Sequence, residues 1–140
     1  MAFAGINHLA VVLAAAASFI FGGIWYGVLS SAWMEAAGVR PEDMKRPDGS
    51  PVFAPYITTF VALLVMAYML AGIIGHLGMG QVTLRNGLIS AGFIWGGFVL
   101  TALVVNHAFQ GRSKTLTLID GGHWLGVLLV QGAVIGLMSV

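Results

Sequence analysis

Residues 6–29 read INHLAVVLAAAASFIFGGIWYGVL, a stretch that contains no Asp, Glu, Lys or Arg. An α-helix needs about 20 residues to cross about 30 Å of hydrocarbon at about 1.5 Å per residue. Three further apolar stretches of similar length follow, at 54–77, 85–108 and 118–140. We therefore predict an all-α fold in which the chain forms a single domain, an integral membrane bundle of four transmembrane helices.

The composition agrees with this fold and excludes several classes of function. Hydrophobic residues make up 59% of the chain and charged residues 8%, whereas a soluble domain has about 25% charged residues. The formal net charge of +1 is too small to favour nucleic acid as a partner. The absence of Cys excludes disulfides, thiolate nucleophiles and iron–sulfur clusters. No cofactor is expected.

The distribution of Lys and Arg predicts the orientation in the membrane. The connections between helices one and two and between helices three and four hold five of the six basic residues, and Arg85 is the exception. Because basic residues are enriched in cytoplasmic loops, we expect loops 30–53 and 109–117 in the cytoplasm and both termini on the opposite side. We expect a multi-pass location in a bacterial inner membrane.

The connection 30–53 is predicted to be a polar loop, because Gly and Pro interrupt it repeatedly. Within it, the acidic residues that follow Pro41 favour a short helix over 41–46. Before the loop come three aromatic residues at the depth where amphipathic rings prefer the lipid headgroups. We interpret these as interfacial anchors: Trp25, Tyr26 and Trp33.

Small residues at four-residue spacing predict how the helices pack. Lipid is as apolar as the side chains, so helices in a bilayer associate through close backbone approach. The glycines expected to mediate this packing are Gly22, Gly92, Gly96, Gly122, Gly126, Gly132 and Gly136, with Gly23 and Gly27 beside Gly22. These faces exceed what one four-helix bundle requires. We therefore expect homo-oligomerisation or docking to a larger membrane complex, in contact with membrane lipids.

Several short motifs resemble a known family. They are Asn7-His8-Leu9, Gly22-x-x-Trp25-Tyr26, Ala32-Trp33-Met34, Gly97-Phe98 and Phe109-Gln110-Gly111-Arg112. In this spacing, within a chain of about this length, they resemble the bacterial and fungal membrane family called domain of unknown function 1761. The resemblance covers nearly the whole chain and implies a small fold with four membrane spans. It implies no reaction and transfers no site residues.

The predicted cytoplasmic face gathers one cluster of polar side chains: Asn106, His107, Gln110, Asp120 and His123. Asp120 and His123 are three residues apart and share a helix face, and a short hairpin brings His107 towards them. Two imidazoles and a carboxylate can bind a divalent metal or transfer a proton. The structural alternative is that ionisable groups at a helix end simply reach the interface. We assign no metal site and keep these three residues only as candidate ligands.

The opposite face gathers a second polar cluster: Asn7, His8, His76, Arg85 and Asn86. A charged Arg is costly at mid-membrane, so Arg85 is expected at the boundary, near lipid phosphate. Anchoring is the main interpretation of this cluster, with ligand binding as the alternative. In the interior, Gln131 carries a bulky amide that requires hydrogen-bond partners.

Three functions follow from these observations. The first is a structural or accessory membrane component of unknown activity that associates with itself or with a larger complex, and it draws on the small-residue faces. The second is a small transporter or channel, which the polar clusters at both faces favour. The third is an intramembrane enzyme with a metal at His107, Asp120 and His123. No catalytic motif is present, so we assign no catalytic residue and do not expect an enzyme.

Overall fold

The computed structural model describes residues 3–139, and in that part of the chain the fold is all-α. The elements, in order, are α1 (His8–Val28), α2 (Ser30–Ala37), the 3₁₀ turn η1 (Pro41–Met44), α3 (Ala54–Gly75), α4 (Leu84–Ile94), the π-helical turn η2 (Trp95–Val99), α5 (Leu100–Phe109) and α6 (Lys114–Met138). Within residues 3–139, four continuous helical segments are long and apolar enough to cross a membrane: α1, α3, α6 and the composite segment Leu84–Phe109. The predicted four-helix fold class is confirmed.

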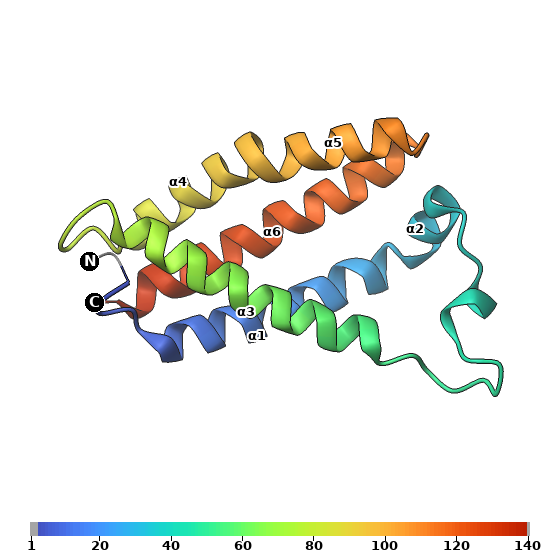
Figure 1. Ribbon diagram of the computed structural model, residues 1–140, viewed down its shortest axis with the longest axis horizontal. Helices are drawn as coiled ribbons and strands as arrows, with labels where there is room; N and C mark the ends of the chain where they lie inside the picture. The colour runs from blue at the N-terminus through green and yellow to red at the C-terminus, as the bar shows by residue number, and fades with distance from the viewer. Residues whose placement is uncertain (1–2, 140) are drawn as a thin grey trace.

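The long helices alternate in direction, as Figure 1 shows. Both ends of the described chain and the connection between α3 and α4 lie at one end of the bundle. The helix α2, the loop that follows it and the α5–α6 hairpin lie at the other end. The helix α6 is central, because it packs against α1, α3 and α4. The connections 30–53 and 109–117, which were predicted to lie on the same side of the membrane, therefore lie at the same end of the molecule.

Polar side chains cap the first turns of three helices, α1, α4 and α6. The side chains of Asn7, Thr83 and Ser113 accept hydrogen bonds from the first free backbone N–H groups of α1, α4 and α6. The cap at Ser113 starts α6 at Lys114 rather than at 118, so the helix begins earlier than the apolar stretch. The helix ends at Met138. Residue 140, which the predicted fourth helix included, lies outside the described residues.

The connection between α1 and α3 differs from the predicted loop over 30–53, because its first part is the helix α2. For residues 30–37 the prediction of a loop was wrong, and the reason is local. The segment SSAWMEAA consists mostly of residues that tolerate or favour a helix, and the first glycine comes only at Gly38, which ends α2 with φ 68°. The expected short helix over 41–46 is present as the shorter turn η1, Pro41–Met44.

The rest of this connection is held by local hydrogen bonds. The carboxylate of Asp48 accepts hydrogen bonds from the backbone N–H and the hydroxyl of Ser50, at 2.9 and 2.6 Å. These bonds stabilise the charged carboxylate, so they lower the pKa of Asp48. An isolated bridge between Lys45 and Pro51 closes the same turn.

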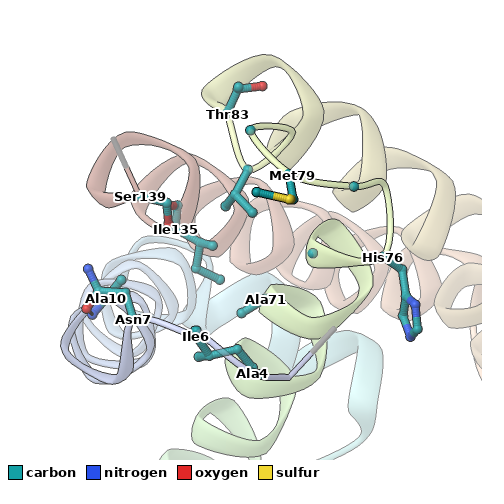
Figure 2. A pocket seen from close by; sticks show the side chains of 15 residues that line it. Ala4, Ile6, Asn7, Ala10, Ala71, His76, Met79, Thr83, Ile135 and Ser139 are labelled. Atoms are coloured by element: carbon teal, nitrogen blue, oxygen red, sulfur yellow. Dashed lines mark hydrogen bonds between the residues drawn. The ribbon is translucent and has the colours of Figure 1, made fainter. Parts of the chain in front are cut away.

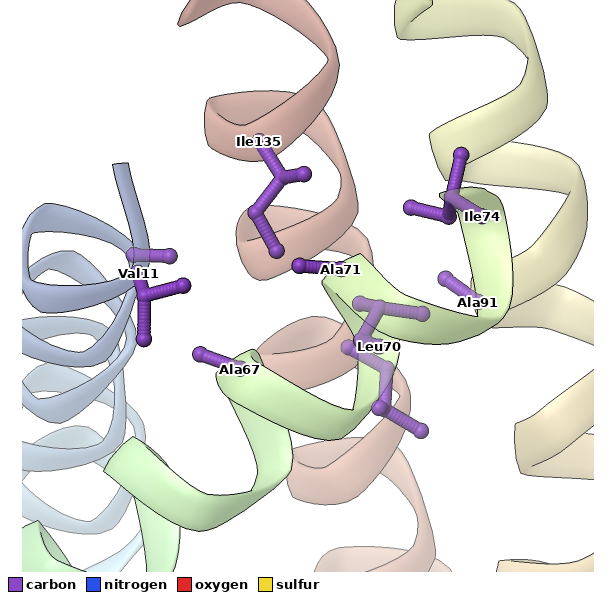
Figure 3. Close-up of a cluster of buried hydrophobic side chains, with 9 residues drawn as sticks. Val11, Ala67, Leu70, Ala71, Ile74, Ala91 and Ile135 are labelled. Atoms are coloured by element: carbon purple, nitrogen blue, oxygen red, sulfur yellow. The ribbon is translucent and has the colours of Figure 1, made fainter. Parts of the chain in front are cut away.

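The largest buried cluster joins all four spans near the end that holds the termini, and Figure 3 shows its side chains. It contains Val11, Ala14, Ala67, Leu70, Ala71, Ile74, Ala91, Leu128 and Ile135. Small residues bring the backbones close together there. A methyl group at Gly132 would collide with the backbone of Gly87, and one at Gly136 with the backbone of Thr83 and Leu84. Direct backbone contact therefore fixes the crossing of α4 and α6.

Candidate functional site

A chain of polar side chains links three helices near the α2 end of the bundle. The Tyr26 hydroxyl donates a hydrogen bond of 2.7 Å to Oδ1 of Asp120. On its other side, Oδ2 of Asp120 lies 3.8 Å from Nε2 of His107. The Nδ1 atom of His107 is hydrogen-bonded to the hydroxyl of Thr117 at 2.8 Å. We call Tyr26, His107, Thr117 and Asp120 the polar network. Its side chains come from three helices, α1, α5 and α6.

Tyr26 and His107 lie in the last turns of α1 and α5, whereas Asp120 lies further inside α6. Asp120 is six positions after the first residue of α6, which places it about 9 Å along the helix. The side chain of Asp120 is 19% exposed and that of His107 is 11% exposed. A carboxylate in this position is costly unless it is paired or hydrogen-bonded. The Tyr26 hydroxyl and the nearby imidazole supply that stabilisation.

Two of the five residues of the predicted inner cluster, His107 and Asp120, enter this network. Asn106 and Gln110 are exposed, and Gln110 ends α5. His123 is buried one turn beyond Asp120, where its ring packs against Phe21, Tyr26 and Trp124. A methyl group at Gly22 would lie 2.8 Å from Nε2 of His123. Within the described chain, Nδ1 of His123 has no hydrogen-bond partner.

The geometry does not support metal binding by these residues. Among residues 3–139, no group of three or more His, Asp or Glu side chains is placed to hold a metal ion. His107 and Asp120 face one another, whereas the ring of His123 lies among aromatic rings. Within the described residues, the three candidate ligands therefore do not form a group that could hold a metal ion.

Aromatic side chains tie the outer helices to α6. The indole N–H of Trp25 donates to the carbonyl of Ile119 at 3.0 Å, and that of Trp95 donates to the carbonyl of Gly121 at 2.8 Å. Trp33 of α2 packs edge-on against Tyr26. Trp25 and Tyr26, interpreted from the sequence as interfacial anchors, thus also bind α6 directly.

The sequence did not reveal the partners of Tyr26 and Trp95. Each contact joins residues far apart in the chain, so no local spacing predicts it. The sequence could have indicated such contacts only through side-chain chemistry, because Tyr and Trp inside a membrane helix need an acceptor for their polar hydrogen. Asp120 was the one acidic residue at depth.

The side-chain amide of Gln131 is hydrogen-bonded to two other helices inside the bundle. Its Nε2 donates to the Ser18 hydroxyl and to the carbonyl of Leu63, both at 3.1 Å. Gln131 and Ser18 are fully buried. Within the described chain, Oε1 of Gln131 has no partner. This contact links α1, α3 and α6.

The opposite end of the bundle contains a cavity of about 680 Å³, shown in Figure 2. It lies among the segment before α1, the end of α3, the connection to α4 and the end of α6. Two residues of the predicted outer cluster line it, Asn7 and His76. The side chain of Asn7 already makes two hydrogen bonds. Its oxygen caps α1, and its amide nitrogen donates to the carbonyl of Met138 at 3.0 Å.

The other outer residues lie apart from this cavity. His8 stacks on Tyr68, and Asn86 donates hydrogen bonds to Gln81 within the α3–α4 connection. Arg85 lies in the first turn of α4 and is exposed. The five residues of this cluster therefore share one end of the molecule but do not form a single site.

The fold and the network together define a class: a small helical protein with four helices of membrane-spanning character and a polar network that joins three of them at one end. Within that class, the chain belongs to the family described as "Protein of unknown function (DUF1761)", whose match covers residues 9–136. The family indicated by the sequence motifs is confirmed. No curated protein and no solved structure matches the chain.

Proposed function

We propose that this protein is a structural or accessory membrane component that associates with copies of itself through glycine faces of α1 and of the segment formed by α4 and η2. The single observation that carries the proposal is that the glycines differ in their packing. Some are packed against neighbouring helices, and others are open at the same four-residue spacing. Open faces of this kind allow close helix–helix contact between chains in lipid.

The glycines of the central helix are occupied within the chain. Methyl groups at Gly122 and Gly126 would collide with the rings of Trp25 and Phe21, and those at Gly132 and Gly136 with the backbone of α4 and the residue before it. The side chain of His123 likewise occupies the space beside Gly22. These glycines allow the helices of a single chain to pack closely against one another.

Two glycine pairs remain open. A methyl group at Gly23, Gly27, Gly92 or Gly96 would meet no atom of the described chain within 4 Å. The second pair lies on the segment Leu84–Phe109, the least buried of the four spans, with 6% of its most apolar window buried. In that segment the exposed faces include Phe93 and Phe98, at 76% and 75% exposure. We infer that a second copy covers the Gly92–Gly96 face.

The interior of the bundle favours this proposal over transport. The fully buried Val127, which packs with Ala15 and Leu63, lies between His123 and Gln131 on α6. The polar groups on α6 are thus separated by apolar packing, so they form no continuous path for a polar solute. The absence of a three-ligand cluster in the described residues likewise gives the metal-enzyme hypothesis no geometric support.

Native mass spectrometry of the full chain, released from its membranes in native-like lipid discs, tests the proposal. We expect the wild-type protein to appear as a defined oligomer. The double substitution Gly92→Leu and Gly96→Leu fills the open face, so it should shift the protein to a monomer without unfolding it. The Gly23→Leu and Gly27→Leu pair tests the α1 face in the same way.

The matched control is Ala62→Leu, because Ala62 is an exposed small residue on α3 outside both glycine faces. It should leave the oligomer unchanged. A wild-type chain that is strictly monomeric in lipid discs contradicts the proposal. An oligomer that survives both glycine double substitutions contradicts the assignment of the faces.

A further inference from the structure

The cavity at the end of the bundle that holds the termini is larger than a packing defect. Its volume is about 680 Å³. Few voids in a folded interior exceed the size of a water molecule, whereas pockets that hold small organic ligands have volumes of about 300–1,000 Å³. The cavity therefore has the size of a ligand site.

Contacts between helices hold the walls of the cavity in place. The side chain of Asn7 joins the start of α1 to the carbonyl of the last residue of α6 at 3.0 Å. A methyl group at Gly136 of α6 would collide with the backbone of Thr83, just before α4. In the segment before α1, the ring of Phe3 lies so close to Gly72 of α3 that a methyl group there would collide with it. The cavity is thus formed before any ligand binds.

The floor of the cavity is apolar. It is formed by the buried side chains of Ala10, Ala71 and Ile135, which come from α1, α3 and α6. Figure 2 shows Ile6, Ala71 and Ile135 around this space. A water molecule needs two to four polar partners to occupy a cavity stably, and an apolar floor offers none. An apolar group is therefore favoured in the deep part of the cavity.

The lining lacks charged side chains. Among the described residues that line the cavity there is no Asp, Glu, Lys or Arg. A charged group that enters an apolar cavity without a partner of opposite charge loses its hydration at a large cost in free energy. The lining therefore selects against ions and favours an uncharged ligand.

Two polar side chains lie together on one side of the lining. The Ser139 hydroxyl donates to the carbonyl of Ile135 at 2.8 Å, so its oxygen can still accept a hydrogen bond. The amide nitrogen of Asn7 donates one hydrogen to the carbonyl of Met138, the residue before Ser139, and it carries a second hydrogen. Together these groups can accept a hydrogen bond from a single hydroxyl group and donate one to it.

We propose that this cavity is a binding site for an uncharged amphiphile, a molecule with an apolar body and one hydroxyl group. The apolar body lies against Ala10, Ala71 and Ile135, and the hydroxyl group lies at Asn7 and Ser139. The cavity is at the end of the four spans, the depth at which the polar group of an amphiphile meets the membrane boundary. This inference does not depend on the proposed self-association, because none of the four open glycines lines the cavity.

Photolabelling of the full chain in lipid discs tests the site. The probe is decanol with a diazirine on its chain, and two matched probes carry the same chain with a carboxylate or a trimethylammonium head group. We expect the alcohol to label residues 4–10, 71–83 and 135–139 in a saturable manner, and excess unlabelled decanol should prevent this labelling. The two charged probes should label these residues at least about tenfold less, because the lining offers them no partner.

Two substitutions test the two parts of the site. Ala71→Leu places a larger side chain in the floor, so it should reduce labelling at least about tenfold. Ala62→Leu, the same change at an exposed position of α3, should leave labelling unchanged. Ser139→Ala removes an acceptor and should weaken labelling about threefold to tenfold. Its control is Ser31→Ala, at an exposed position of α2 at the other end of the molecule.

Thermal unfolding of each variant in the same discs shows whether it is folded. If Ala71→Leu does not fold, Ser139→Ala decides the test, because Ser139 is exposed and follows the last residue of α6. Equal labelling by the three probes, or labelling that rises without saturation, would show that the alcohol only partitions into the surrounding lipid, and it would overturn the proposal. Wild-type labelling of a folded Ala71→Leu or of Ser139→Ala would also overturn it.

Discussion

At the scale of single residues, glycines with the same spacing have opposite roles. Gly132 faces the backbone of Gly87, while Gly92 faces open space within the described chain. We expect Gly132→Ala to destabilise the bundle by about 1–3 kcal/mol, because the new methyl group meets backbone that cannot rotate away. The free energy of unfolding of the full chain in mixed micelles measures this.

Gly92→Ala is the matched control on the neighbouring helix. It should be neutral or stabilising by up to about 1 kcal/mol, since Ala is favoured over Gly inside a helix. Equal losses of stability for Gly132→Ala and Gly92→Ala would contradict the close crossing of α4 and α6.

The residue scale also shows the limit of sequence patterns. The four-residue spacing identified the packing glycines but not their partners, because Gly132 and Gly136 look the same as Gly92 and Gly96 in the sequence. What distinguishes them is which helix lies opposite. Similarly, the hairpin between α5 and α6 predicted that His107 approaches Asp120, whereas the approach of Tyr26 depends on a contact across 94 positions.

At the scale of elements, α2 is the helix that apolar periodicity did not predict. It follows α1 after a single residue, and the hairpin before α6 caps its last turn. Arg112 donates to the carbonyl of Ala37, and the Ser113 hydroxyl donates to the carbonyl of Ala36, both at 3.2 Å. These donors satisfy carbonyls that have no partner inside the helix.

We expect Arg112→Ala to loosen α2 without affecting the long helices. Hydrogen–deuterium exchange of the full chain in lipid discs measures this, and exchange should accelerate about tenfold over residues 30–37, which corresponds to about 1.4 kcal/mol. Lys114→Ala, a loss of the neighbouring positive charge, is the control and should have little effect on α2. Equal protection of α2 in wild type and Arg112→Ala would show that the cap is dispensable.

At the scale of the whole molecule, the number and order of the long helices were predictable because the bilayer imposes a length and an apolar composition on each span. The helix ends were less predictable, since polar caps such as Ser113 extend a helix beyond its apolar stretch. The interior could not be predicted in detail, because the Gln131 contact and the polar network both join helices that are distant in the sequence.

The central claim is that four helices cross a membrane, with the 30–53 and 109–117 connections on one side and the α3–α4 connection on the other. Labelling of single cysteines with a membrane-impermeant maleimide in intact cells tests it most directly, with Met44→Cys, Gln81→Cys and Gln110→Cys as probes and buried Ala14→Cys as the control. We predict that Gln81→Cys reacts in intact cells, that Met44→Cys and Gln110→Cys react only after the membrane is opened, and that Ala14→Cys stays unreactive. Labelling of Met44→Cys and Gln81→Cys from the same side would contradict the account.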